Sequence, residues 1–250
     1  MVFRSKIKYV LNAFLASVIV IALVWLSVIQ LSINFDFAFL NVFSKRIWQG
    51  FWMTLALSLV GFALSLFIGI IAALGENSKI LLLKFLSSIY VNFIRGTPLI
   101  MQIYLFFYII GSAWGINSRF LSGVIILSMF EGAYIAEIIR GGIEGLDSTQ
   151  LEAAKAVGFS KRQTLGLVVI PQLIARTLPP LVGQFSSIIK DSSLLSMIAV
   201  IELTQTMREI SALNLRLFES YLTLGVLYLI LTLPLALIGK ILEKKFSYEQ

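Results

Sequence analysis

The stretch IWQGFWMTLALSLVGFALSLFIGIIAALG, residues 47–75, contains no charged side chain. A transmembrane α-helix needs roughly 20 mostly apolar residues, because each residue rises about 1.5 Å through a hydrocarbon core about 30 Å thick. The stretch exceeds that length. It therefore predicts a helix that crosses a membrane.

Five other stretches predict spans of the same kind. They are residues 9–35, 96–118, 120–139, 177–201 and 220–239. Two of them carry charge inside the apolar run: 120–139 contains Glu131 and Glu137, and 177–201 contains the pair Lys190-Asp191. We therefore expect an all-α, polytopic membrane protein with about six transmembrane helices.

The composition of the whole chain agrees with a membrane protein and excludes several kinds of chemistry. Of its 250 residues, 58% are hydrophobic and 13% are charged, whereas a soluble domain has roughly 25% charged residues. The chain has neither Cys nor His. Zinc sites, Ser-His or Cys-His catalysis, haem attachment, Fe–S clusters and disulfides all need one of these residues. We expect no catalytic residue, no metal site and no enzyme activity in this chain.

The basic residues predict how the chain is oriented in the membrane, because Lys and Arg are enriched in short cytoplasmic loops. If the N-terminus is cytoplasmic, the cytoplasmic set is Arg4, Lys6, Lys8, Lys79, Lys84, Arg140, Lys155, Lys161, Arg162, Arg176, Lys240, Lys244 and Lys245. The opposite set is only Lys45, Arg46, Arg119, Arg208 and Arg216. We therefore place both termini in the cytoplasm. The net charge of +7 is then a consequence of topology, and no nucleic-acid partner is expected.

Residues 1–35 form a separate N-terminal part, with a basic tip followed by the first apolar stretch. A cleaved signal peptide has an apolar region of about 7–15 residues and a small-residue cleavage site. The stretch 9–35 is longer, and no such site follows it closely. We expect an uncleaved transmembrane anchor, with cleavage as the alternative.

The longest connection between spans reads RGGIEGLDSTQLEAAKAVGFSKRQTLGLVVIPQLIARTLPP, residues 140–180. A short helix is expected to begin at Asp147, Ser148 or Thr149. Glu152 stands three residues after Thr149, which is the spacing of a capping box. Gly158 should end this helix, because Gly is the usual residue after a helix C-terminus.

A second short helix is expected after the first. Ser160 followed by Gln163 is another capping-box pair, and Pro171 should interrupt the helix that they begin. The small residues Ala153 and Ala154 would lie at the exposed turn of this helix–Gly–helix loop. Such a surface suits docking into a groove of a partner, and the alternative is an amphipathic loop lying on the membrane.

Several motifs of the chain resemble the permeases of bacterial ABC importers. Glu152-Ala153-Ala154, Gly158 and Pro171 match the family's EAA loop, EAA-x3-G-x9-I-x-L-P, with Val168 in place of Ile and Ile170 in place of Leu. Three runs look like the branch that takes up polar amino acids, and they stand at residues 95–99, 132–142 and 190–204. Ile201 departs from the proline usual in that branch. The resemblance covers residues 47–245, with the coupling loop at 141–180.

The resemblance implies a type I ABC-importer permease core of five helices, to which the first span is an addition. It implies that this chain pairs with a second permease subunit, which is either another copy or a paralogue. It also implies a dimer of ATPase subunits that docks on the EAA loop. It also implies an extracytoplasmic amino-acid-binding protein and a place in the bacterial inner membrane. ATP and Mg²⁺ would be bound by the ATPase, and this chain would hold no cofactor. Consistent with that, the chain lacks the phosphate-binding pattern G-x-x-x-x-G-K-[ST].

Charged residues at membrane depth are the candidates for a role in transport, because burying a charge in lipid costs about 2.5–3.5 kcal/mol. Glu131 could attract a substrate ammonium or guanidinium, or it could be a carboxylate that packs between helices. Arg95 precedes a Gly-Thr-Pro break and could form an ion pair or line the pathway. With Arg95 we group Gln102 and Tyr134 as candidate pathway residues.

Other residues of the spans have structural interpretations. Glu137 is expected to pair with Arg140 at i,i+3 spacing, and Lys190 with Asp191 in an ion pair near the inner gate. Tryptophans near span ends, such as Trp48, are expected to be interfacial anchors. Close helix packing is predicted for the stretch 61–73, because it contains the small residues Gly61, Gly69 and Ala73.

Two other classes of function compete with an ABC permease. An ion-gradient secondary transporter would show an internal repeat with broken helices, and no convincing repeat is found. An intramembrane aspartate protease needs two aspartates in the membrane, but of Asp36, Asp147 and Asp191 two lie outside it. Neither class accounts for the EAA loop.

Overall fold

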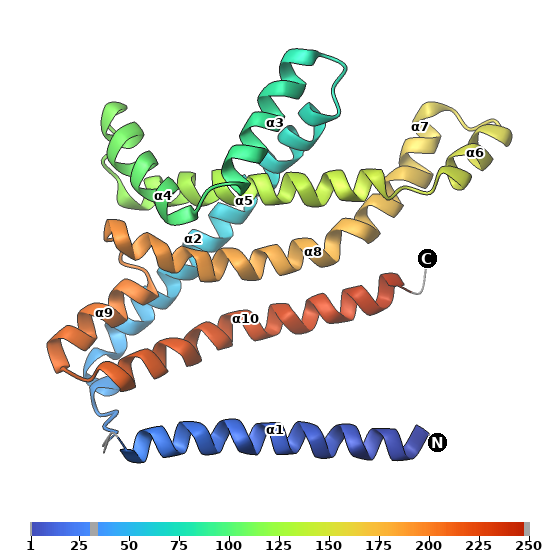
Figure 1. Cartoon of the computed structure of the whole chain (residues 1–250). Coiled ribbons are helices and arrows are strands. Elements are labelled where there is room, and N and C mark those ends of the chain that lie inside the picture. Colours follow the sequence, from blue (N-terminus) through green and yellow to red (C-terminus); the bar gives the residue numbers. More distant parts are fainter. Residues whose placement is uncertain (1, 31–34, 248–250) are drawn as a thin grey trace. The chain divides into compact units, whose positions relative to one another are not determined.

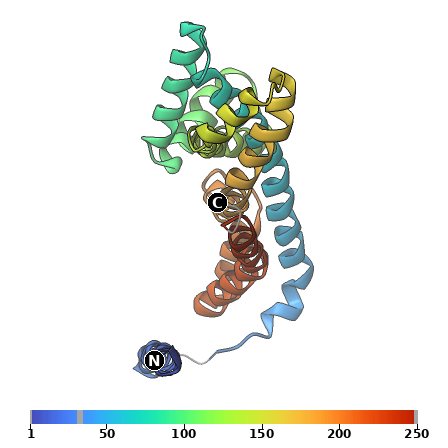
Figure 2. The same cartoon turned by 90° about the vertical axis from the view of Figure 1, so that its right-hand side faces the viewer.

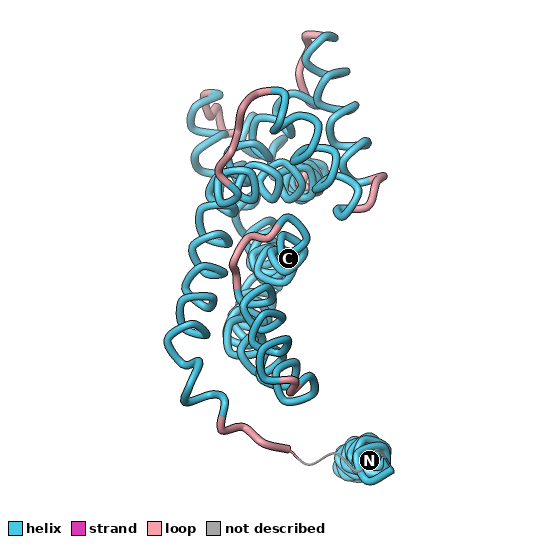
Figure 3. The backbone as a smooth tube through the Cα atoms, turned by 90° about the vertical axis from the view of Figure 1, so that its left-hand side faces the viewer, coloured by secondary structure: helices cyan, strands magenta, loops and turns pink. Residues whose placement is uncertain are grey.

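The computed structural model describes residues 2–30 and 35–247, and all regular structure in these residues is helical (Figures 1 and 3). The chain divides into two compact units, residues 1–39 and 40–250. The first unit contains α1 (Val2–Gln30). The second contains the other helices, starting with α2 (Phe39–Glu76) at the boundary.

The second unit consists of long helices joined by shorter ones. After α2 come α3 (Leu81–Arg95), α4 (Leu99–Tyr104), the π-helix η1 (Leu105–Gly111), α5 (Arg119–Glu144), α6 (Ser148–Ala156), α7 (Lys161–Thr164), the π-helix η2 (Leu165–Val169), α8 (Ile170–Asp191), the 3₁₀-helix η3 (Ser192–Ile198), α9 (Leu203–Asn214) and α10 (Leu217–Ser247). Figure 2 shows α5, α8 and α10 nearly end-on, whereas α2 runs across them.

Four helical segments of the described residues are long and apolar enough to cross a membrane. They are Phe39–Glu76, Arg119–Glu144, Lys161–Ile198 and Leu217–Phe246. They confirm the spans predicted at 47–75, 120–139, 177–201 and 220–239, although the third begins earlier than expected.

The bounds of the span predicted at residues 96–118 are wrong, because it includes only the second part of a broken span that begins earlier, with α3. The helix α3 and the segment α4–η1 meet at 112° and together could form one broken span. Proline has no N–H and disfavours a helical conformation in the residue before it, so Pro98 ends one helix and allows another to begin. Sequence inspection overlooked α3 because it has only 15 residues and includes Lys84.

The first predicted span, residues 9–35, corresponds to α1. The apolar part of this helix, Phe14–Gln30, is shorter than the predicted stretch. Residues 31–34, at the end of that stretch, lie outside the described residues.

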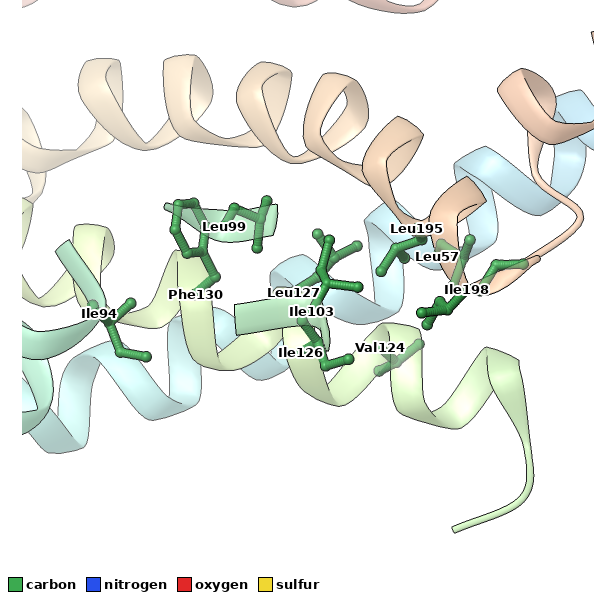
Figure 4. Close-up of a cluster of buried hydrophobic side chains, with 12 residues drawn as sticks. Leu57, Ile94, Leu99, Ile103, Val124, Ile126, Leu127, Phe130, Leu195 and Ile198 are labelled. Atoms are coloured by element: carbon green, nitrogen blue, oxygen red, sulfur yellow. The ribbon is translucent and has the colours of Figure 1, made fainter. Parts of the chain in front are cut away.

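The largest apolar core lies where α2, α3, α4, α5 and η3 meet (Figure 4). The residues labelled in Figure 4 are Leu57, Ile94, Leu99, Ile103, Val124, Ile126, Leu127, Phe130, Leu195 and Ile198. Helix α5 supplies four of these ten and lies at the centre of the second unit. It also packs along α8, which packs in turn along α10.

The predicted interruption of the second loop helix at Pro171 is wrong. The helical path continues from α7 through η2 into α8, and the whole segment Lys161–Ile198 is one candidate span. Pro171 lies in the first turn of α8, and the π-helical turn η2 precedes it. The change from α-helical to π-helical hydrogen bonding in η2 lets the helical path accommodate the proline without ending.

Helices α2 and α5 cross in close contact at Gly69. A Cβ atom on Gly69 would lie 2.5 Å from Ile135 Cγ2 and 3.0 Å from the carbonyl oxygen of Gly132. Ser128 Oγ donates a hydrogen bond of 3.3 Å to the carbonyl oxygen of Gly61 across the same pair of helices. The close packing predicted for this face of α2 is confirmed at Gly69.

We predict that Gly69→Ala lowers the free energy of unfolding by about 1–3 kcal/mol, because the added methyl group overpacks the crossing. Gly61→Ala is the matched control on the same helix, since its Cβ would meet only Leu127 Cβ at 3.8 Å. Thermal unfolding of the detergent-purified protein measures both. Equal melting temperatures for the two variants would contradict the close crossing.

Candidate functional site

The loop between α5 and α8 folds into two short helices, α6 and α7, which we call the knuckle (residues 147–164). Asp147 caps α6 by accepting a 2.9 Å hydrogen bond from the Thr149 N–H. Of the three candidates for the start of the helix, Asp147 is therefore the cap. The suggested capping box between Thr149 and Glu152 is wrong, because Thr149 lies inside the first turn.

Gly158 makes the turn between the two helices. Its φ is +80°, which a residue with a side chain rarely adopts. The Gly158 N–H donates to the Lys155 carbonyl at 3.1 Å, and the Phe159 N–H donates to the Ala154 carbonyl at 3.0 Å. These two hydrogen bonds close the end of α6 in a Schellman motif. The prediction that Gly158 ends this helix is confirmed.

Helix α7 begins as the sequence predicts. The Gln163 N–H donates to Ser160 Oγ at 3.4 Å, and the Ser160 N–H donates to Gln163 Oε1 at 2.9 Å. Both hydrogen bonds of the capping box are therefore present. Because α7 leads directly into η2 and α8, the knuckle is continuous with a membrane-spanning helix.

The knuckle lies at one end of the second unit (Figure 1) and has both polar and apolar exposed residues. Ala154 is buried, whereas Glu152 and Ala153 are exposed. Val157 is 70% exposed and adds apolar surface beside them. Both alanines were predicted to lie at an exposed turn. The prediction is confirmed for Ala153 and wrong for Ala154.

Gln172, which the sequence does not single out, fastens the knuckle to α8. Its Oε1 accepts a 3.2 Å hydrogen bond from the Asp147 N–H, and its Nε2 donates a 2.9 Å hydrogen bond to Gln150 Oε1. Gln172 directly follows Pro171 in the first turn of α8. No local pattern could have indicated these contacts, since the partners are 25 and 22 residues away.

Arg95 and Tyr134, both predicted pathway residues, meet near the end of α3. The Arg95 guanidinium lies 5.7 Å from the centre of the Tyr134 ring and 3.0 Å from Glu137 Oε2. Arg140 Nε donates to the same Glu137 oxygen at 3.1 Å, so the predicted pair of Glu137 and Arg140 is confirmed. Arg95 is therefore part of an ion-paired cluster that joins α3 to α5.

Gln102, the third of these residues, is buried at the bend of the broken span. Its Nε2 donates to the Ile94 carbonyl at 2.8 Å and to Thr97 Oγ1 at 2.7 Å. The side chain thus bonds to backbone and hydroxyl groups where the helix is interrupted. In this structure Gln102 holds the bend together.

Glu131 is fully buried between α5 and α8, where it accepts a hydrogen bond from Gln184 Nε2. Asp191 and Lys190 are charged groups near it. Lys190 is exposed and Asp191 is half-buried. Within residues 2–30 and 35–247 neither makes an ion pair, so the predicted pairing of Lys190 with Asp191 is absent there.

Glu202 is a second buried carboxylate, at the start of α9. It accepts hydrogen bonds from the backbone N–H groups of Thr204 at 2.7 Å and Gln205 at 2.8 Å. The Tyr228 hydroxyl donates a third, at 3.0 Å, and joins α10 to the cap of α9. Burial raises the pKa of Glu202 to about 7, and the three hydrogen bonds oppose that rise.

Comparison with known proteins places these features in a family. Residues 65–248 match the family described as binding-protein-dependent transport system inner membrane component. The chain belongs to this family. The permease therefore is a multi-pass membrane protein, and the family match includes the knuckle and every helix from α3 onward.

Named relatives of the permease have similar lengths. It is 36% identical over 199 residues to the L-cystine transport system permease protein TcyB of Bacillus subtilis, an alignment that covers 79% of this chain and 85% of that protein. It is 35% identical over 202 residues to the glutamine transport system permease protein GlnP of Escherichia coli, with coverages of 80% and 92%.

Solved structures show the same fold. A chain of "an amino acid ABC transporter with histidines" superposes with a TM-score of 0.78 at 32% identity, covering 85% of the permease and 100% of that chain. An inward-facing structure of the MetNI methionine ABC transporter gives a TM-score of 0.65 at 18% identity, with coverages of 82% and 97%. The expected type I ABC-importer permease fold is confirmed.

We predict that the permease loses stability as pH rises from about 4.5 to about 7 through Glu202. The folded pKa lies above the unfolded value, so the folded state binds the proton more tightly and is favoured at low pH. Glu202→Gln cannot ionise and should reduce this loss. The melting temperatures of both proteins at pH 5 and pH 8 test it, and an identical pH dependence would contradict the raised pKa.

Proposed function

We propose that the permease is the transmembrane subunit of an ATP-driven ABC importer for polar amino acids. The knuckle carries this proposal, because it is an exposed, well-capped element continuous with a membrane span. The names of the cystine and glutamine relatives support amino acids as the substrates. An ion-gradient transporter needs no such docking element.

The knuckle is the docking site for a dimer of ATPase subunits. Ala153 leaves room for close approach, Val157 offers apolar surface and Glu152 offers charge. ATP and Mg²⁺ are bound by the ATPase, and this chain supplies no cofactor and no enzymatic step. Its own contribution is to transmit motion.

The remaining partners follow from the same assembly. A second permease, identical or paralogous, completes the pathway, and an extracytoplasmic binding protein delivers the amino acid. Both termini and the knuckle lie in the cytoplasm of a bacterial cell, and the spans lie in its inner membrane among lipids. Nucleic acid has no part in this function.

A chain of polar contacts links the knuckle to the membrane spans. Gln172 joins α6 to α8, and the contact between Gln184 and Glu131 joins α8 to α5. The ion pair between Glu137 and Arg95 then joins α5 to α3. A displacement of the knuckle by a closing ATPase dimer is thereby passed to the helices that open one side of the membrane and close the other.

Glu131 and its neighbours form the proposed substrate pathway. When α5 and α8 separate, the Glu131 carboxylate loses Gln184 and can attract a substrate ammonium or guanidinium. Arg95 and Tyr134 lie further along the same helical cluster, and Gln102 keeps the broken span bent beside them. Lys190 and Asp191, at the end of α8, act as gate residues.

We predict that Gly158→Val lowers ATP-dependent uptake on the order of tenfold or more while the protein stays in the membrane. Valine at φ +80° strains the knuckle by about 1–2 kcal/mol, and each 1.4 kcal/mol of weakened docking is tenfold. Glu152→Lys should act similarly by reversing a surface charge. Uptake into vesicles that contain all subunits measures both.

Gly225→Val is the matched control, since its Cβ would meet nothing within 4 Å and its backbone is ordinary helix. It should transport like the unaltered permease. If the Gly158 and Glu152 variants both kept full uptake, docking on the knuckle would be wrong.

We predict that Glu131→Gln weakens uptake of arginine more than uptake of glutamine, because only the cationic substrate uses the carboxylate charge. Glu209→Gln, which alters a carboxylate paired with Arg46 near the start of α2, is the control and should affect both substrates alike. Competition between the two labelled amino acids in the same vesicles gives the ratio. Equal losses after Glu131→Gln would contradict a role in recognising charge.

A further inference from the structure

A groove follows one face of α2 near its N-terminal end. Lys45, Trp48, Gln49, Trp52, Met53 and Ala56 line it from α2, at spacings of three and four residues that place them on one side of the helix. Phe120, at the start of α5, and Ile201 close the other side. The groove has a volume of about 910 Å³, which is ample for a bound ligand.

The groove is apolar along its length and basic at one end. Trp48 is 54% exposed and Trp52 is 60% exposed, and both line the groove from α2. Lys45 is the one charged side chain among the lining residues. It makes no ion pair with any other described residue.

The dimensions of the groove match one leaflet of a bilayer. From Lys45 to Ala56 the helix rises about 16 Å at about 1.5 Å per residue, which is close to half of a hydrocarbon core about 30 Å thick. Tryptophan favours the boundary between headgroups and acyl chains. A headgroup at the level of Lys45 and Trp48 would therefore leave room for one acyl chain along the groove as far as Ala56.

We propose that this groove binds an anionic phospholipid, with its headgroup phosphate at Lys45 and one acyl chain along Trp48, Trp52 and Ala56. The charge of the lining residues complements a phosphate, because the groove contains a cation and no carboxylate. A covering protein surface fits less well: lysine is depleted from protein interfaces, and covering an ammonium without a partner is costly. This site is independent of the knuckle and of amino-acid specificity.

Fluorescence quenching by brominated lipids tests the proposal. The chain has four tryptophans, so Trp25→Phe and Trp114→Phe leave Trp48 and Trp52 as reporters in the groove. The full chain is reconstituted in phosphatidylcholine vesicles that contain a minor fraction of phosphatidylglycerol or phosphatidylcholine with brominated acyl chains. We expect brominated phosphatidylglycerol to reach the same quenching as brominated phosphatidylcholine at a concentration about fivefold lower. One lysine beside an anionic headgroup contributes about that difference in affinity.

Lys45→Ala should abolish this preference. Lys79→Ala is the matched control, because Lys79 is exposed just beyond the opposite end of α2, and it should retain the preference. Equal quenching by the two lipids would mean that the groove contacts lipid without preferring an anionic headgroup, and would overturn the proposal. An absence of quenching by either would also overturn it, because the groove would then be covered by another part of the chain or by a second copy.

Discussion

The side chain of Gln102 makes hydrogen bonds to a stretch of backbone that has been interrupted inside the membrane. Lipid provides no water for unpaired backbone groups, so a broken helix survives there only if protein groups replace the missing partners. From α4, Gln102 Nε2 donates to the Ile94 carbonyl in α3 and to the Thr97 hydroxyl within the break. The resulting bend of 112° brings Ile94 and Leu99 into the same apolar core and leaves Arg95 facing Glu137.

Polar contacts between helices select which helices lie side by side in a membrane protein. Apolar packing in lipid gives little preference for one helix partner over another, since lipid tails are as apolar as leucine. The contact of Glu131 with Gln184 and that of Glu137 with Arg95 each join two particular helices. The glycine crossing at Gly69 adds steric specificity, because it allows α2 to approach α5 closely. Together these contacts determine which helices of the second unit lie side by side.

Much of this arrangement could be predicted from the sequence, because it depends on local rules. Long uncharged runs identified α2 and α10, and cap residues identified the knuckle with its turn at Gly158. Two predictions failed near prolines. The span predicted at 96–118 is bent at Pro98 and begins earlier, with α3, and the helix predicted to be interrupted at Pro171 continues into α8. Contacts across long separations, such as Gln172 with Asp147, leave no local pattern. The expected pair of Lys190 and Asp191 failed for a related reason, since adjacent residues on a helix point in different directions.

The central claim is that the knuckle is the surface on which an ATPase subunit docks. The most direct test places a photo-crosslinking amino acid at Ala153 in the assembled transporter, and the same group at Trp114, which is 81% exposed between η1 and α5. The account predicts a crosslink from position 153 to the ATPase subunit and none from position 114. A crosslink to the ATPase from position 114, or none from position 153, would contradict it.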